Sequence, residues 1–317
     1  MTPQFSAQNP SPPQPGNARS RMPFSLLRVA VLLFFGYTGI CAVLAWKSVK
    51  ANPEKLTETP QRWHIPYEDV TFQSADGTPL SGWYVPVKSH PKGVIILCHG
   101  VDGNRISMLP VAHMLHQHGY AALLFDFRAR GQSGGTRCTL GYREVDDLLA
   151  AVQAVRARPD AKKLPMGVLG ESMGGAVALI GTARCPDIRA VVAESPFASL
   201  DHAVANHFHS IIGIGGPFLG VPTRWIGEKL IGAHCEDIAP VHEIDRIAPR
   251  PVFLIQDEAD TLCPKEETKE LMAAAKKPKS LWTVRYAVHV NAKWVESGEY
   301  ERRVTTFFDR NLHASSH

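Results

Sequence analysis

The sequence predicts an α/β fold in which a mostly parallel central sheet is covered by helices on both faces. Continuous apolar runs, typical of strands that are buried on both sides, alternate along the chain with segments of helical spacing. One strand-to-helix transition, Leu164–Thr182, contains a Gly-x-Ser-x-Gly turn. The chain has 317 residues, of which 44% are hydrophobic, so it is long enough for one large domain of this class and an appendage.

The N-terminal residues are predicted to lie outside that domain. Residues 1–22 are rich in Pro, Gln, Ser and Asn and lack apolar periodicity, which predicts a disordered tail. Residues 23–47 contain the uncharged run Val29–Trp46, which is just long enough to span a bilayer and predicts an uncleaved transmembrane anchor. A signal peptide cleaved near Ala45 and a hydrophobic docking helix are the alternatives. Residues 48–65, with prolines and mixed charges, are predicted to be a linker.

The orientation of the anchor is left open by the charges around it. Arg19, Arg21 and Arg28 favour a cytoplasmic N-terminus, but lysines follow the run within the same distance. We expect a single-pass membrane protein, with an extracytoplasmic catalytic domain slightly favoured.

The soluble domain is predicted to cover residues 66–313 and to begin with an antiparallel hairpin. Tyr67–Pro86 alternates apolar and polar residues on both sides of the turn sequence Ala75-Asp76-Gly77. Further strands are predicted at Val94–Leu97, Ala121–Phe125, Met166–Leu169, Ala190–Ala193, Val252–Ile255 and Trp282–Val288. Helices are predicted at about Met108–Gln117, Tyr142–Arg158, Met173–Arg184, Glu266–Lys276 and Glu299–Phe308. The interval 199–242 is longer than a simple crossover needs, so we expect a helical cap there.

Composition and residue spacing give little support to nucleic-acid binding, a zinc site or a disulfide framework. A net charge of +4 without a dense Lys/Arg stripe gives little support to nucleic-acid binding. Six cysteines are scattered without a Cys-x-x-Cys pair, which indicates mostly buried free thiols rather than a zinc site or a disulfide framework. His202, His207 and His209 lie close together but lack the spacing of a recognised metal motif.

Ser172 is the candidate nucleophile. A strand that turns at once into a helix strains the backbone of the serine and brings other backbone close, so glycines two residues either side relieve the clash. The turn would hold the hydroxyl above the N-terminus of the following helix, where the N–H of Met173 could meet a developing oxyanion. The glycine-rich turn His99–Arg105, after the first parallel strand, could point the N–H of Val101 at the same oxyanion.

A base and an acid are expected at the same edge of the sheet, because the loops after parallel strands form the binding crevice. His289 follows the last strand and would take the proton of Ser172. Asp260, in the loop after Val252–Ile255, would orient the imidazole. The order Ser172, Asp260, His289 is the chain order expected when the serine turn lies on this sheet topology.

Other carboxylates compete for the role of the acid. Glu194, at the end of the preceding strand, is the substitute for Asp260, although a supporting or cap contact is the simpler interpretation. Asp257 and Glu258 lie nearer their strand, and their side chains are expected to face the helices or solvent.

Together these segments resemble the α/β-hydrolase superfamily, most of all the bacterial serine hydrolases described as serine aminopeptidase-like or Bem46-like. The resemblance covers residues 67–312 and is carried by the serine turn, the His99-Gly100 turn, Asp126–Gly134, Asp260 followed by Pro264, and His289. It implies an α/β-hydrolase fold.

The resemblance also implies roles: Ser172 as nucleophile, Asp260 as acid, His289 as base, and Val101 and Met173 as oxyanion donors. The chain departs from the family pattern at two positions, with Asp257 and Val288 where a glycine is usual before the acid and before the histidine.

These observations predict a membrane-anchored serine hydrolase that cleaves carboxylic esters through an acyl-enzyme intermediate, with no metal or organic cofactor. A peptidase or amidase acting on short peptides is the alternative enzyme, since fold alone does not choose the chemistry. A non-catalytic binding protein on the same fold is the alternative from another class. The expected partners are a small-molecule ester or short peptide and the membrane; the acyl chain and the oligomeric state stay open.

Overall fold

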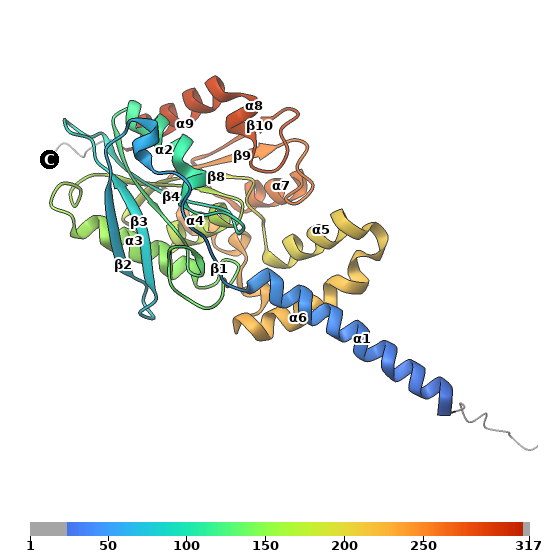
Figure 1. The fold of residues 1–317 in the computed structure, drawn as a ribbon. Coiled ribbons are helices and arrows are strands. Elements are labelled where there is room, and N and C mark those ends of the chain that lie inside the picture. Colours follow the sequence, from blue (N-terminus) through green and yellow to red (C-terminus); the bar gives the residue numbers. More distant parts are fainter. Residues whose placement is uncertain (1–23, 313–317) are drawn as a thin grey trace, which may run out of the picture. The chain divides into compact units, whose positions relative to one another are not determined.

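The structure, a computed structural model, describes residues 24–312 (Figure 1). The predicted disordered tail, residues 1–22, lies outside the described residues. The chain divides into two compact units with the boundary between Ile40 and Cys41. Helix α1 (Phe24–Val49) crosses this boundary and is long and apolar enough to span a membrane, a test that a signal sequence would also pass.

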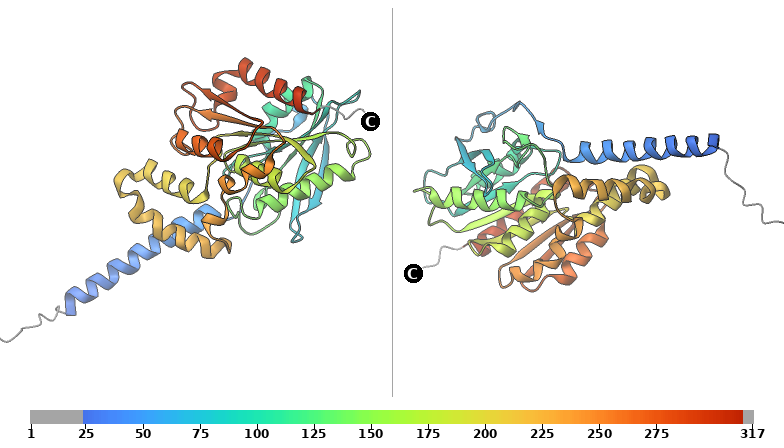
Figure 2. Two further views of the ribbon diagram at one scale, coloured as in Figure 1. Left: turned by 180° about the vertical axis from the view of Figure 1, so that it is seen from behind. Right: turned by 90° about the horizontal axis from the view of Figure 1, so that it is seen from below.

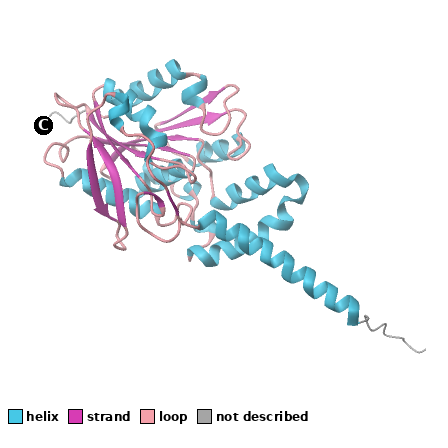
Figure 3. Ribbon diagram, in the orientation of Figure 1, coloured by secondary structure: helices cyan, strands magenta, loops and turns pink. Residues whose placement is uncertain are grey.

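Eight strands form the central sheet in the order β10-β9-β8-β7-β4-β5-β3-β2 (Figures 1 and 3). They are β2 (Glu68–Gln73), β3 (Pro79–Val85), β4 (Gly93–Cys98), β5 (Tyr120–Phe125), β7 (Met166–Glu171), β8 (Ile188–Glu194), β9 (Val252–Asp257) and β10 (Lys279–Val284). Strand β3 runs antiparallel to both of its neighbours, and the other pairs are parallel. The predicted mostly parallel sheet, with a hairpin near one edge, is confirmed.

Helices cover both faces of this sheet, as Figure 2 shows. They are α2 (Leu109–Gln117), α3 (Glu144–Ala157), α4 (Met173–Arg184), α7 (Lys265–Ala274), α8 (Ala292–Val295) and α9 (Ser297–Asn311). Successive residues of β4 belong to different cores: Ile96 lies with α3, α4 and α7, whereas Ile95 lies with α2 and α9. Both faces of β4 are buried, so its residues are apolar on both sides. This burial explains the continuous apolar runs in the sequence.

The last strand is displaced from its predicted position. Strand β10 pairs in parallel with β9 from Lys279 opposite Val252 to Val284 opposite Asp257. Beyond Val284 the chain turns, with Tyr286 at a φ of 62°, so residues 285–288 form a loop rather than strand.

The segment predicted as a linker, residues 48–65, is packed on the α/β domain at both ends. Val49 is buried in the main core, and its carbonyl accepts a hydrogen bond from the N–H of Cys138 at 2.8 Å. The short strand β1 (Asn52–Pro53) pairs with β6 (Arg130–Gly131). Further along, Ile65 is buried in the second core. The apolar side chains at both ends of the segment are buried in the two cores. The chain therefore contacts the domain directly after α1.

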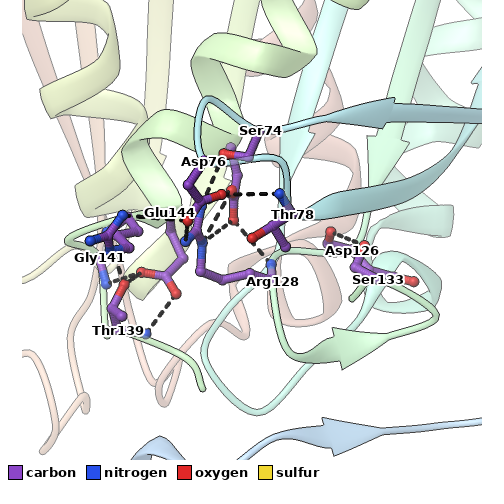
Figure 4. A network of polar contacts seen from close by, with 11 residues as sticks. Ser74, Asp76, Thr78, Asp126, Arg128, Ser133, Thr139, Gly141 and Glu144 are labelled. Atoms are coloured by element: carbon purple, nitrogen blue, oxygen red, sulfur yellow. Dashed lines mark hydrogen bonds and ion pairs between the residues drawn. The ribbon is translucent and has the colours of Figure 1, made fainter. Parts of the chain in front are cut away.

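A polar network fixes the loops at the hairpin side of the domain (Figure 4). The guanidinium of Arg128 donates to the carboxylates of Asp147 and Asp76 and to Oγ of Ser74. The carboxylate of Glu144 accepts from the N–H groups of Thr139 and Gly141. These bonds connect the β2–β3 turn, the segment after β5 and the start of α3, and so fix their positions relative to one another.

The predicted cap at 199–242 contains two helices, α5 (Leu200–Ile212) and α6 (Gly216–Ile231), joined by the 3₁₀ turn η3 (Gly213–Gly215). Further 3₁₀ turns are η1 (Pro60–Trp63), η2 (Arg105–Met108), η4 (Cys235–Asp237), η5 (Pro240–His242) and η6 (Ile244–Ile247). Oγ of Ser199 accepts the N–H of His202 and so begins α5. Glycines 216 and 220 leave room for the backbone and ring of Phe208, which lets α6 lie close against α5.

Candidate active site

Ser172 lies in a strained turn between β7 and α4. Its φ of 54° and ψ of −120° are rare for a residue with a side chain, and the residue is half-buried. A Cβ on Gly170 would lie 2.1 Å from the carbonyl oxygen of Gly174, and one on Gly174 would lie 2.2 Å from that of Cys98. Only glycine fits at these two positions, which is the steric reason for the Gly-x-Ser-x-Gly pattern.

The structure brings Ser172, His289 and Asp260 together in one hydrogen-bonded chain. Oγ of Ser172 lies 2.8 Å from Nε2 of His289, and Nδ1 of His289 lies 2.7 Å from Oδ2 of Asp260. Because the carboxylate can only accept, Nδ1 carries the proton and Nε2 is free to accept from the serine hydroxyl. The imidazole is 23% exposed and the Asp260 carboxylate is buried.

Two backbone N–H groups fix the Asp260 carboxylate. Its Oδ1 accepts from Leu262 at 2.8 Å and from Cys263 at 2.9 Å, which leaves Oδ2 for the imidazole. The loop that follows β9 thus presents one oxygen of Asp260 to His289 and holds the other. By contrast, the neighbouring Glu258 is exposed, as its position near the strand predicted.

The candidate oxyanion loop, His99–Val101, follows β4 and packs directly on Ser172. Strand β5 lies on one side of β4 in the sheet, and β7 lies on the other side. The carboxyl ends of β4 and β7 therefore form a topological switch point, which is where open α/β sheets bind their ligands. A Cβ on Gly100 would lie 3.5 Å from Cβ of Ser172. The backbone of Val101 is therefore close to the serine, and Met173 is the first residue of α4.

His99 and Arg130 hold this loop from behind. Nδ1 of His99 lies 2.7 Å from the carbonyl oxygen of Gly100, and its Nε2 accepts from the N–H of Phe127 at 3.0 Å. Burial lowers the pKa of His99, which suits the neutral ring that these two bonds require. Nε of Arg130 donates to the carbonyl of Val101 at 2.6 Å, which restricts the orientation of the adjoining peptide group.

A buried ion pair lies beneath the site. Nζ of Lys293 is 2.8 Å from Oε1 of Glu171, and both side chains are buried. Burial raises the pKa of Glu171, while the nearby Lys293 ammonium opposes this rise. The pKa of Lys293 is also raised, because the carboxylates of Glu171 and Glu194 outweigh the effect of its burial.

Two further carboxyls, those of Glu194 and Asp257, support the segment after His289. Oε1 of Glu194 accepts from the N–H of Ala292, and Oδ2 of Asp257 accepts from the N–H of Asn291, each at 3.1 Å. Burial and the Glu171 carboxylate raise the pKa of Glu194 to about 8. Its Oε2 has no hydrogen-bond partner among the described residues, which is consistent with a neutral carboxyl.

Asp257, which was expected to face the helices or solvent, is not exposed to solvent and instead bonds Asn291, the N-cap residue of helix α8. Strand β9 continues to Asp257, and the side chain is fully buried at the carboxyl end of the sheet, where it also accepts from Oγ of Ser195 at 3.0 Å. Burial raises its pKa. Sequence reasoning did not find the supporting roles of Lys293, His99 or Arg130. A lone lysine four residues after a candidate histidine carries no recognisable signal.

Two groups of potential metal ligands occur among the described residues. One consists of Asp260, Cys263 and His289. The Asp260 carboxylate and the His289 imidazole of this group are already hydrogen-bonded to each other. The other is His202, Glu267 and Glu270, in which Glu267 is satisfied by the N–H of Ala198 and by Asn206.

Comparison with known proteins identifies the family to which this fold belongs. The family model for the serine aminopeptidases (S33) matches residues 89–226. The uncharacterized protein YfhR of Escherichia coli K12 is 30% identical over 84% of this chain and 89% of its own length. The α/β-hydrolase domain-containing protein WAV2 of Arabidopsis thaliana is 28% identical over 84% of this chain and 90% of its own.

Solved structures agree. The Pyrococcus furiosus esterase Pf2001 is 30% identical, has a TM-score of 0.68, and is matched over 82% of this chain and 100% of the esterase. The acylaminoacyl peptidase of Pyrococcus horikoshii, at 17% identity and a TM-score of 0.61, shares the fold. The chain therefore belongs to the α/β hydrolases, in the group that contains the YfhR proteins.

Proposed function

We propose that this protein is a serine hydrolase that cleaves carboxylic esters through an acyl-enzyme intermediate, held at a membrane by helix α1. The observation that carries the proposal is the chain of hydrogen bonds from Ser172 through His289 to Asp260, with donor–acceptor distances of 2.8 and 2.7 Å. Such a chain supplies a nucleophile, a general base and an anion that orients the base.

The proposed reaction begins when Oγ of Ser172 attacks the ester carbonyl and its proton passes to Nε2 of His289. The negative charge that develops on the carbonyl oxygen would be stabilised by the N–H groups of Met173 and Val101. The imidazolium then returns the proton to the departing alcohol, which leaves an acyl group on Ser172. Water, deprotonated by the same imidazole, would attack that acyl group and release the acid.

A peptidase is the second candidate, favoured by the family model of serine aminopeptidases. An aminopeptidase needs an anionic group for the substrate's free amine. Glu171 and Glu194 are both buried, so neither carboxyl is accessible to a substrate amine, and Glu171 is already paired with Lys293. This arrangement supports ester cleavage over aminopeptidase activity.

One experiment tests the nucleophile and ranks the substrates. The purified protein is treated with a fluorophosphonate probe and assayed against acyl esters of increasing length and against short peptides. We expect labelling at Ser172 and ester turnover. Ser172→Ala should abolish labelling and lower turnover roughly a million-fold while the fold stays intact, because the oxyanion donors alone leave little catalysis. Retention of more than a few per cent of the activity would contradict this role, and binding without turnover would favour a non-catalytic protein.

A further inference from the structure

The tip of the cap carries apolar side chains that the domain does not bury. This apolar tip consists of Ile211, Ile212, Ile214, Val221 and Trp225. Ile214 in η3 is 97% exposed, Ile211 at the end of α5 is 67% exposed, and Trp225 on α6 is 62% exposed. Figures 1 and 3 show α5 and α6 as a helical pair outside the layers that cover the sheet. Large apolar side chains exposed together on one small helical element are typical of a surface that meets a partner.

The exposed side chains share one face of α6. Val221 and Trp225 are four residues apart, which places them on one side of the helix. Gly216 and Gly220 lie on the side that packs against Phe208 of α5. The cap therefore uses glycines for its internal contact and presents its large apolar residues outward.

The charges around the apolar tip suit a phospholipid surface. No Asp or Glu occurs between Asp201 and Glu228, so the tip carries no carboxylate that a bilayer would repel. The ammonium of Lys229 lies 5.9 Å from the centre of the Trp225 ring. A tryptophan beside a lysine, at the border of an apolar face, is the composition found where helices lie in a membrane interface.

The connection to α1 keeps the domain near a bilayer. Val49, the last residue of α1, is buried in the domain core, and Asn52 already pairs with Arg130. There is no spacer between the apolar helix and the catalytic domain. A bilayer crossed by α1 would therefore lie within reach of the domain's surface, and this step rests on the anchor of the proposed function.

We propose that the apolar tip of the cap docks into the headgroup region of a phospholipid bilayer and gives the domain a second membrane contact besides α1. The side chains of Ile211, Ile214 and Trp225 enter the apolar boundary of the leaflet, and Lys229 remains at the headgroups. The enzyme then meets hydrophobic acyl esters at the lipid surface rather than in bulk water.

The test measures the depth of the tip in a bilayer with the full-length chain. Ile214→Cys is labelled with a nitrobenzoxadiazole dye, which is selective because all six native cysteines are buried. The protein is reconstituted into vesicles of phosphatidylcholine with a minor share of phosphatidylglycerol and a nitroxide-labelled phosphatidylcholine. We expect blue-shifted emission that the nitroxide quenches. Lys163→Cys, an exposed site before the start of β7, is the matched control and should stay in water.

The outcomes separate the cap from the anchor. Flotation of the protein with the vesicles reports on α1, so a protein that does not float overturns the anchor and this inference with it. If the protein floats but the dye at position 214 behaves like the dye at position 163, the docking is overturned while the anchor stands. A blue shift that depends on protein concentration and resists the nitroxide would show that the tip meets a second copy of the chain, which also overturns the proposal.

A kinetic test does not depend on the dye. Replacing Ile211 and Ile214 by Ser and Trp225 by Gln should lower turnover of a long-chain ester embedded in vesicles by about tenfold, because the removed side chains supply apolar burial at the interface. Turnover of the water-soluble p-nitrophenyl acetate should stay within about twofold, since the site itself is untouched. Leu281→Ser, at an exposed position on β10, is the control and should change neither rate. Equal loss with both esters would overturn the docking.

Discussion

The ammonium group of Lys293 lies 2.8 Å from Oε1 of Glu171, the residue immediately before Ser172. Lys293 itself lies four residues after His289, in helix α8. The ion pair therefore ties the backbone that carries the candidate nucleophile to the backbone that carries the candidate base. This connection is independent of the hydrogen bond between Ser172 and His289.

Lys293→Met should destabilise the protein, because it leaves the Glu171 carboxylate buried without its partner. Breaking a buried ion pair from one side costs about 3–5 kcal/mol. Denaturant unfolding of the variant measures this loss. The double variant Lys293→Met/Glu171→Gln should recover much of it, since no charge is then buried alone. Lys269→Met, which breaks an exposed pair with Glu266, is the control and should change stability by about 0.5 kcal/mol or less. An unchanged midpoint for Lys293→Met would contradict the role of the pair.

Asp260→Asn should lower turnover by about three to four orders of magnitude, because the amide would hold the imidazole in the wrong tautomer. The melting temperature should change little. Asp257→Asn, Glu258→Gln and Glu194→Gln should each cost about tenfold or less, because supporting groups orient the base without replacing it. Steady-state kinetics on the four variants checks the assignment. A crippled Glu194→Gln beside a mild Asp260→Asn would show that the acid lies on the earlier strand.

Stability should fall with rising pH through the titration of Glu194. The folded-state pKa of about 8 lies above the value of roughly 4.3 expected in an unfolded chain, so folding favours the protonated carboxyl. Its contribution is complete below about pH 4 and is lost progressively as the pH rises to 8. Glu194→Gln keeps the side chain neutral at every pH, so the variant should lose less stability between pH 5 and about 8 than the parent. Melting temperatures of both proteins measured across this pH range test the prediction. Parallel curves of melting temperature against pH would contradict it.

The full-length protein should stay in the membrane fraction through a carbonate wash if α1 spans the bilayer uncleaved. A mature N-terminus near Trp46, measured by mass spectrometry, would show a cleaved signal instead.

A chain that begins at Asn52 should be soluble and active but less stable than one that begins at Lys47. The shorter chain lacks Val49, which is buried in the core, and the Lys50 carbonyl, which accepts from Arg130. Removal of a buried valine costs about 2 kcal/mol, which corresponds to a drop of roughly 4–8 °C in melting temperature for a domain of this size. Equal melting temperatures would show that this segment adds nothing to the domain.

The regions predicted best are those in which steric contacts between nearby residues allow only one backbone conformation. The two glycines around Ser172 are required by carbonyl oxygens 2.1 and 2.2 Å from where a Cβ would stand, so strand, turn and helix could be placed from the sequence. The fold class followed from strands that are buried on both faces. Asp260 and His289 could be nominated from chain order, and the structure places His289 against Ser172 and Asp260 against His289.

Features that depend on contacts between distant segments escaped prediction. Asp257 looks like any carboxylate at the end of a strand until the segment after His289 is folded over it, with the N–H of Asn291 at 3.1 Å. Lys293 becomes recognisable only when Glu171, 122 positions away, is placed next to it. Residues 48–65 have the composition of a linker, yet their few apolar side chains were enough to pack against the domain.

Arg130 connects two parts of the molecule that have been described separately. Its Nη1 donates to the carbonyl of Lys50, one residue after α1, and its Nε donates to the carbonyl of Val101 in the candidate oxyanion loop. If α1 is a membrane anchor, a movement of the Lys50 carbonyl would act on the same rigid guanidinium that holds the Val101 carbonyl, one peptide group away from the candidate oxyanion N–H. The rate of hydrolysis would then vary with the lipid composition of the membrane, because one arginine side chain bonds both segments.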